Sequence, residues 1–357
     1  MKRSSQRHAS GKEYRMKGMK QTTNLDDVRL HGGIHTLEIR TPQTLTKVAG
    51  ADGPLYPTLD NTEDDMRVLY TWKINVNKYA RETGKYREHY ITSRSDFSTL
   101  LDLMMQDMGA SEYQITRADF RVDSYETPWR EMLKWNYALM YAIRAQLGWT
   151  DEVHRWDGTK PTVEVYADKR RDKRHTCDSI ICYDRAAKPG NTAPTTMRLE
   201  FRNVRDMANM DVVSGVGAEW AKKIYHCVNE DTFTAMQQAA TEQILDELRP
   251  ELVETEALHM GVNKKALFIR SRERIFTPKQ AVLLGTQIGL APESVRKYVK
   301  AQPFPLNREW VTPEALRTYA CHVTDALWRF LMPEMGIGYP QDLWIFSRIE
   351  LEELPEI

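Results

Sequence analysis

Four strand-like segments carry polar side chains that alternate with apolar ones. Because side chains alternate across a strand with a period of two, each segment has one apolar face and one polar face. The segments are residues 115–123, 162–166, 179–185 and 197–202, and three of them carry the polar positions Arg117, Asp119, Arg121, Asp123, Glu164, Tyr166, Arg198, Glu200 and Arg202. A sheet built from them buries one side on helices and presents Asp, Glu, Arg and Tyr on the other.

These residue types are the ones that handle phosphate esters. Carboxylates hold hard divalent cations, and guanidinium groups bind phosphate. Asp119 and Asp123 are four residues apart on one strand, so their Cα atoms lie about 13 Å apart and are not expected to share one ion. We expect Asp119 and Glu200 to hold Mg²⁺ or Mn²⁺, with Asp123 at the rim of the metal site. Ordinary salt bridges on a solvated sheet face are the alternative.

A tyrosine on such a face is a candidate nucleophile. A phenol near a carboxylate-bound cation can attack a DNA phosphodiester and become a covalent carrier of the strand. Tyr166 shares a strand face with Glu164 and lies just before a basic run at residues 169–175, so it is the first candidate, and Tyr183 is the second. The basic groups expected to contact phosphates here are Arg117, Arg198, Lys169, Arg170 and Arg171.

The same segments resemble the motifs of rolling-circle replication initiators over about residues 110–205. Residues 116–123 are similar to the "TRxDhxhD" strand, residues 180–185 to "hxhYDK" and residues 197–202 to "hRhEhR". Residues 166–172 look like the "YxGSRKS" segment that carries the nucleophile. Two positions depart from the pattern: Asp168 stands where glycine is usual, and Ala118 replaces a larger aliphatic residue.

The resemblance implies an enzyme that starts replication of a plasmid, phage or mobile element. It implies a nick at a double-stranded origin, a 5′-phosphotyrosine intermediate and a divalent metal held by acidic side chains. The expected partner is origin DNA, single-stranded or hairpin at the nick, with a host helicase and a second copy of the chain as further candidates. A non-enzymatic helix-turn-helix regulator is the main alternative, and a nuclease without a covalent step is a weaker one.

Residues 276–300 have the pattern of two short helices around a glycine. Thr277 and Gln280 have the spacing of a capping box, and Gly289 ends the first helix. The second helix carries Arg296, Lys297 and Lys300, which we expect near DNA in a helix-turn-helix. A plain helical hairpin gives the same pattern.

The remaining pattern predicts an α+β fold with a mostly antiparallel sheet, helices on one face as in nicking enzymes, and a C-terminal helical domain. We expect a basic tail at 1–30, a catalytic domain at 31–215 and a helical domain at 216–357. The other expected strands are 34–40, 68–77 and 85–91. The expected helices are 95–108, 127–147, about 218–250 and 312–332, with a glycine-containing connection at 210–220.

Composition bounds the class of protein. The chain has 357 residues, 41% hydrophobic and 28% charged, with zero net charge. It has no P-loop, GxGxxG, HExxH or GxSxG motif, and no apolar run of about 18 residues that would span a membrane. The four cysteines lack zinc spacing, which favours a reduced cytoplasmic setting. His31-Gly-Gly-Ile-His35 has the wrong spacing for the histidine pair of many nicking enzymes and is interpreted as a chance pair.

Overall fold

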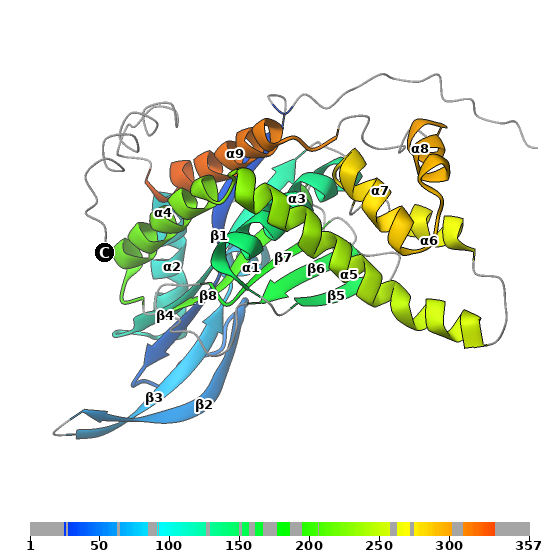
Figure 1. The fold of residues 1–357 in the computed structure, drawn as a ribbon. Coiled ribbons are helices and arrows are strands. Elements are labelled where there is room, and N and C mark those ends of the chain that lie inside the picture. Colours follow the sequence, from blue (N-terminus) through cyan, green and yellow to red (C-terminus); the bar gives the residue numbers. More distant parts are fainter. Residues whose placement is uncertain are drawn as a thin grey trace, which may run out of the picture.

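One antiparallel sheet forms the centre of the protein, in a computed structural model that describes residues 25, 28–62, 65–84, 91, 93–125, 129–149, 152–156, 161–166, 177–185, 195–205, 207–257, 263–271, 275–301 and 310–332. Its eight strands run in the order β2-β3-β1-β4-β8-β7-β6-β5 (Figure 1). Their bounds are β1 Arg29–Thr41, β2 Ala51–Thr62, β3 Asp65–Ile74, β4 Gln114–Tyr125, β5 Glu152–Trp156, β6 Pro161–Tyr166, β7 Ser179–Asp184 and β8 Thr195–Arg205. The predicted α+β class is confirmed.

Helices cover the apolar face that the alternation predicted. Ala118, Phe120 and Val122 of β4 and Met197, Leu199 and Phe201 of β8 are buried in one core. Against them lie α3 (Trp129–Leu147), α4 (Met210–His226) and α9 (Pro313–Leu331). Helix α3 is buried on nearly all sides because the sheet, α5 (Glu230–Ala257) and α9 surround it.

Two glycines let helices pack closely on the sheet. A Cβ atom on Gly32 of β1 would lie 2.2 Å from the carbonyl oxygen of Ala326 in α9. A Cβ atom on Gly217 of α4 would lie 2.7 Å from the ring of Phe120. Residues 210–220 form a helix and not the expected connection. Asn209 caps this helix, and Gly217 lies on the side of the helix that packs on the sheet.

The segment after β3 also differs from expectation. The strand expected at 68–77 ends at Ile74, because Asn75 accepts a hydrogen bond from the Lys78 N–H and starts α1 (Val76–Thr83). The expected strand at 85–91 lies almost wholly outside the described residues, and β3 pairs with β2 and β1. Helix α2 (Arg94–Met108) matches the helix predicted at 95–108. Ser93 caps its start, and Gly109 ends it in the left-handed conformation.

A second, smaller core joins four helices. It is formed by the far part of α5 with α6 (Lys264–Arg270), α7 (Pro278–Gln287) and α8 (Pro292–Ala301), through Ile244, Leu248, Phe268, Leu284 and Val295. Helices α4 and α9 belong instead to the core of the sheet. The domain boundary expected at residue 216 stays a prediction. It does not coincide with the division between these two cores.

The close approach of β1 and α9 generates a stability prediction. We expect Gly32→Ala to lower the free energy of unfolding by about 1–3 kcal/mol, because the new methyl group meets backbone that cannot rotate away. The control is Gly215→Ala in α4, where a Cβ atom meets nothing within 4 Å. That change should raise stability by about 0.5–1 kcal/mol through helix propensity. Denaturant unfolding of both variants measures the difference, and equal stability would contradict the close approach.

Candidate functional site

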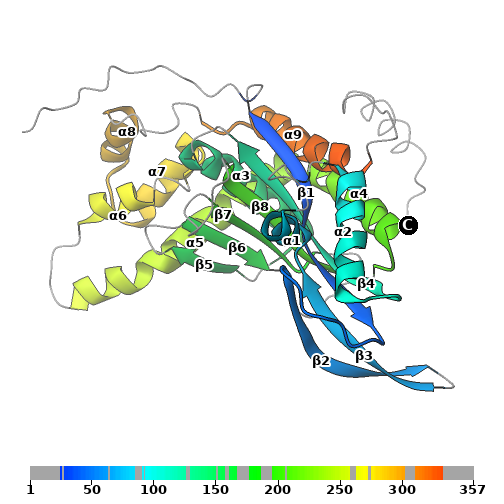
Figure 2. The same ribbon diagram turned by 180° about the vertical axis from the view of Figure 1, so that it is seen from behind.

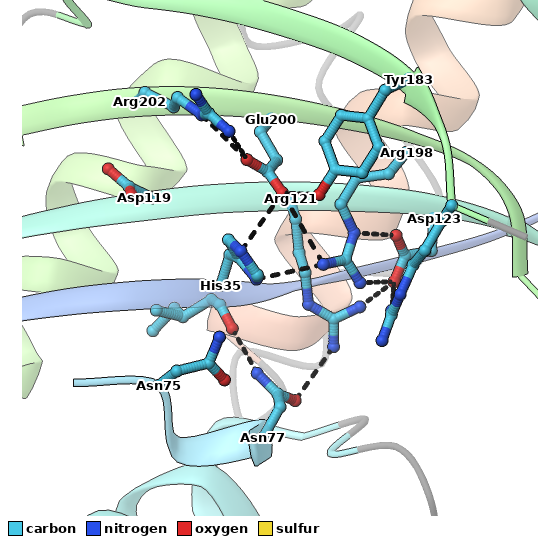
Figure 3. Close-up of polar contacts among 12 residues, drawn as sticks. His35, Asn75, Asn77, Asp119, Arg121, Asp123, Tyr183, Arg198, Glu200 and Arg202 are labelled. Atoms are coloured by element: carbon cyan, nitrogen blue, oxygen red, sulfur yellow. Dashed lines mark hydrogen bonds and ion pairs between the residues drawn. The ribbon is translucent and has the colours of Figure 1, made fainter. Parts of the chain in front are cut away.

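The polar face of the sheet contains a buried network of charges centred on Asp123 of β4. Asp123 is fully buried and accepts hydrogen bonds from Arg198 Nε at 2.5 Å and Nη2 at 2.7 Å. Arg121 Nη1 binds the same carboxylate, and Arg185 Nη1 lies 3.5 Å away (Figure 3). Burial alone would raise the pKa of Asp123, but the charges of Arg121, Arg198 and Arg185 outweigh it and hold the pKa below its usual range.

Asp123 therefore fixes other side chains and is not exposed to a ligand. It stands directly opposite Arg198 in the register of β4 and β8, so the two side chains meet across the ladder. The Arg198 guanidinium is held as a fork, with two of its nitrogens on the two oxygens of Asp123. Asp123 was expected at the rim of the site, but it lies at the buried centre of the network.

Glu200 of β8 forms the second charged centre and is also fully buried. Its Oε1 accepts a hydrogen bond from the Tyr183 hydroxyl, and its Oε2 accepts one from Arg202 Nε at 2.9 Å. Burial would raise the pKa of Glu200, but the positive charges of His35 when protonated, Arg198 and Arg202 hold it at about 2. Burial and the Glu200 charge raise the pKa of Tyr183, so its phenol stays protonated at neutral pH.

His35 of β1 lies between these two centres, as Figure 3 shows. Arg198 Nη1 lies 3.0 Å from His35 Nδ1, and His35 Nε2 lies 3.5 Å from Glu200 Oε1. The buried groups around the ring keep water from it and lower the pKa of His35 to about 3, although a quarter of the side chain is exposed, so the imidazole is neutral at neutral pH. His31 and His35 thus both lie beside residues of β4. His31 stands opposite Asp123 in the register, and its ring contacts that of Tyr125.

A β-bulge and a side chain from α1 place His35. The register of β1 on β4 shifts between Ile34 and Thr36, which leaves His35 as the extra residue. Asn77, in the first turn of α1, donates a hydrogen bond from Nδ2 to the Ile34 carbonyl at 2.9 Å, and its Oδ1 accepts one from Arg121 Nη2 at 3.3 Å. Helix α1 thus lies on the polar face and holds the bulge (Figure 2).

Asp119 lies between two irregularities of the sheet. On one side is the bulge at His35, and on the other the register of β4 and β8 shifts beside Asn203, which has a φ of 60°. Asparagine tolerates this left-handed conformation better than most residues. It turns the Asn203 N–H toward Asp119 Oδ1 at 2.8 Å, and Arg117 donates to the two oxygens at 3.2 and 3.1 Å.

The structure brings together five of the predicted site residues: Asp119, Asp123, Tyr183, Arg198 and Glu200 lie on the adjacent strands β4, β8 and β7. The backbone of Tyr166 pairs with Ser179, and Ser179 pairs with Arg202 on the next strand. Positions 166 and 202 are therefore in register across two strand spacings, with their Cα atoms about 10 Å apart. The Tyr166 side chain, and Lys169, Arg170 and Arg171, lie outside the described residues.

Of the remaining predicted site residues, Arg117 lies at the site and those of α8 lie elsewhere. Arg117 holds Asp119 and is 20% exposed, and Arg296 and Lys297 are exposed on α8, in the second core. The side chain of Lys300 lies outside the described residues. Sequence reasoning missed His35 and Asn77 as members of the site. The signal that could have found His35 was its place on a strand opposite the Asp119 segment, but the pairing of those strands was not predicted.

The described carboxylates do not fit a metal ion as they stand. Both oxygens of Asp119 and both of Glu200 accept hydrogen bonds, so a cation would compete with Arg117 and Arg202 for these carboxylates. Within the described part of the chain, no group of three or more His, Cys, Asp or Glu side chains is placed to hold a metal. The metal on Asp119 and Glu200 stays a prediction.

The network around Asp123 generates a second stability prediction. We expect Asp123→Ala to lower the free energy of unfolding by about 3–5 kcal/mol, because it leaves the buried guanidinium groups of Arg121 and Arg198 without their carboxylate partner. The control is Glu219→Ala, which removes an ion pair with Lys222 between two well-exposed side chains and should cost under about 1 kcal/mol. Denaturant unfolding at pH 7 compares the two. A small effect of Asp123→Ala would mean that the network contributes little to the fold.

Comparisons with known proteins give little further guidance. No protein-family model and no curated protein matches the sequence. Among solved structures, a rolling circle replication initiator protein from Geobacillus stearothermophilus matches at 12% identity with a TM-score of 0.27, over 54% of this chain and 84% of that chain. A likeness at this TM-score carries no argument, so the proposals below rest on residues. Within the described residues, no helix combines the length and the apolar character needed to cross a membrane.

Proposed function

We propose that this protein is a replication initiator that nicks and rejoins origin DNA through a tyrosine and so starts rolling-circle replication. One observation carries the proposal. The segments that resemble the initiator motifs are far apart in the sequence, yet they are the four neighbouring strands β4, β8, β7 and β6. Their described polar side chains also meet on one face: Asp123 with Arg198, and Tyr183 with Glu200.

The charge on this face favours a phosphate ligand. Five arginines, Arg117, Arg121, Arg185, Arg198 and Arg202, pair with four carboxylates, Glu38, Asp119, Asp123 and Glu200. Arg121 and Arg198 are buried, whereas the Arg202 side chain is 31% exposed. Arg202 and Arg117 have the most exposed side chains of the five, so they are the groups that we expect to contact a DNA phosphate, and Arg198 acts by holding its neighbours.

The buried hydroxyl of Tyr183 favours Tyr166 as nucleophile. Tyr183 is 4% exposed, and its hydroxyl donates to Glu200, so it cannot reach a phosphorus atom without breaking that hydrogen bond. In the proposed reaction, the Tyr166 oxygen forms a bond to phosphorus and loses its proton. The bond from phosphorus to the 3′ oxygen breaks, and that oxygen takes up a proton. The strand is held as a 5′-phosphotyrosine until the reverse reaction reseals it.

The nucleophile has a direct test. We expect Tyr166→Phe to abolish the covalent adduct with labelled single strands drawn from inverted repeats beside the gene, while binding of the strands is unchanged. Tyr183→Phe is the matched control and should keep the adduct, since its hydroxyl is used within the protein. Denaturing gel electrophoresis of wild type and both variants measures the adduct.

The outcomes separate the candidate functions. An adduct that disappears only in Tyr183→Phe would reassign the nucleophile. Binding without any adduct in the wild type would favour the non-enzymatic regulator, and cleavage without an adduct would favour a simple nuclease. The same assay in excess chelator tests the predicted Mg²⁺ or Mn²⁺: undiminished cleavage would exclude the metal, and loss of cleavage would support a required divalent cation.

We further propose that α7 and α8 recognise duplex origin DNA. Val295 of α8 is buried against Gly285 of α7, where a Cβ atom would lie 2.2 Å from Val295 Cγ2. Thr277 caps α7 by accepting from the Gln280 N–H, and Gln280 accepts from the Phe276 N–H. This packing supports a rigid pair of helices that leaves Arg296 and Lys297 exposed on the outer side of α8.

These charges generate the fourth prediction. We expect Arg296→Ala with Lys297→Ala to weaken duplex binding and to lower the slope of log affinity against log salt by about 1 for each phosphate that the variant no longer neutralises. Nicking of a short single strand should be unchanged. Lys222→Ala, an exposed lysine of α4, is the control. Binding of origin and scrambled duplex at several salt concentrations measures the effect, and an unchanged slope would leave α8 as a structural helix.

A further inference from the structure

The proton of His35 can be assigned from its partner. Arginine has donors and no acceptor, so the 3.0 Å contact from Arg198 Nη1 makes His35 Nδ1 an acceptor. A neutral imidazole with Nδ1 as acceptor carries its hydrogen on Nε2. His35 therefore presents an N–H group, and not a lone pair, on the side that faces Glu200.

This N–H has no close acceptor among its described contacts. The nearest is Glu200 Oε1 at 3.5 Å, which is longer than the usual range of an N–H···O hydrogen bond. That oxygen already accepts the hydroxyl of Tyr183. The His35 side chain is 25% exposed although Glu200 and Arg198 on either side of it are buried, so the ring is the part of this group that borders the open polar face.

The donor is also rigid. Arg198 fixes the ring through Nδ1 and is itself fixed by two hydrogen bonds to Asp123. The backbone beside the ring is held by the bond from Asn77 to the Ile34 carbonyl. A donor held in this way does not have to reorganise when negative charge develops in front of it, which is the condition for electrostatic catalysis.

We propose that His35 donates a hydrogen bond from Nε2 to a non-bridging oxygen of the phosphodiester that is cut. This inference rests on the proposed function. It makes His35 a catalytic residue that works as a neutral donor, with the partly exposed Arg202 and Arg117 as the cationic contacts of the same phosphate. The competing interpretation is that His35 only completes the buried network.

The test compares three variants with wild type on the strand that wild type nicks. His35→Ala removes the donor, and His35→Gln keeps an N–H group close to the position of Nε2. His226→Ala, an exposed histidine of α4, is the control. Single-turnover adduct formation, strand affinity and melting temperature are measured for each, and the rates are repeated on both phosphorothioate diastereomers at the nick.

We expect His35→Ala to slow adduct formation by about 100-fold, the loss typical of one oxyanion donor, with strand affinity within about twofold. His35→Gln should recover most of the rate. One phosphorothioate diastereomer should slow wild type more than it slows His35→Ala, because sulfur weakens a hydrogen bond that the variant no longer makes. A merely structural histidine would not give this difference between diastereomers.

Two results would overturn the inference. One is a His35→Ala variant that forms the adduct as fast as wild type. The other is an equal loss in His35→Ala and His35→Gln, with a lowered melting temperature and no change in the response to either diastereomer. In both cases wild type still forms the adduct, so the proposed function survives. If wild type forms no adduct, the proposed function fails and this inference is overturned with it.

Discussion

Buried charge on the second face of the sheet is the constraint on which the rest of this structure depends. Asp123 and Glu200 are fully buried, and a carboxylate in that position is tolerated only when it is paired and hydrogen-bonded. Arg198 serves both, through a fork to Asp123 and a 3.7 Å contact to Glu200. Arg198 is itself buried. Removal of either the arginine or its carboxylate partners would therefore leave a buried charge without a partner of opposite sign.

The irregular register of the central strands accompanies this arrangement. A regular ladder would place one residue of each neighbouring strand opposite Asp119, and the sheet instead has a shift on either side of it, at His35 and at Asn203. Bulges leave backbone groups without ladder partners and turn side chains to new directions. Here the freed groups are used: the Asn203 N–H binds Asp119, and the Ile34 carbonyl accepts from Asn77. Local departures from regular pairing thus build the polar site.

The two cores divide the proposed tasks. The sheet with α3, α4 and α9 supplies a rigid support for the charged face, and the small core of α5 to α8 presents exposed cations on α8. A glycine decides the closest approach in each: Gly32 lets α9 approach β1, and Gly285 lets Val295 of α8 pack on α7. In both places a larger side chain would separate the elements.

The sequence by itself determined the local elements and the sorting of side chains between faces. The alternation at 115–123 and 197–202 predicted strands with Phe120 and Leu199 on the buried side, and Thr277, Thr312 and Gly109 marked helix ends, because periodicity and caps are properties of neighbouring residues.

Only the tertiary structure decided what covers the polar face and which strands meet there. A period of two reports which side chains share a face, but not that α1 lies on it, nor that β1 pairs with β4 and carries His35 into the network. Those features depend on strands and a helix that are distant in the sequence, and on bulges that lie beside the charged residues. For the same reason Asp123, expected at an open rim, lies at the buried centre.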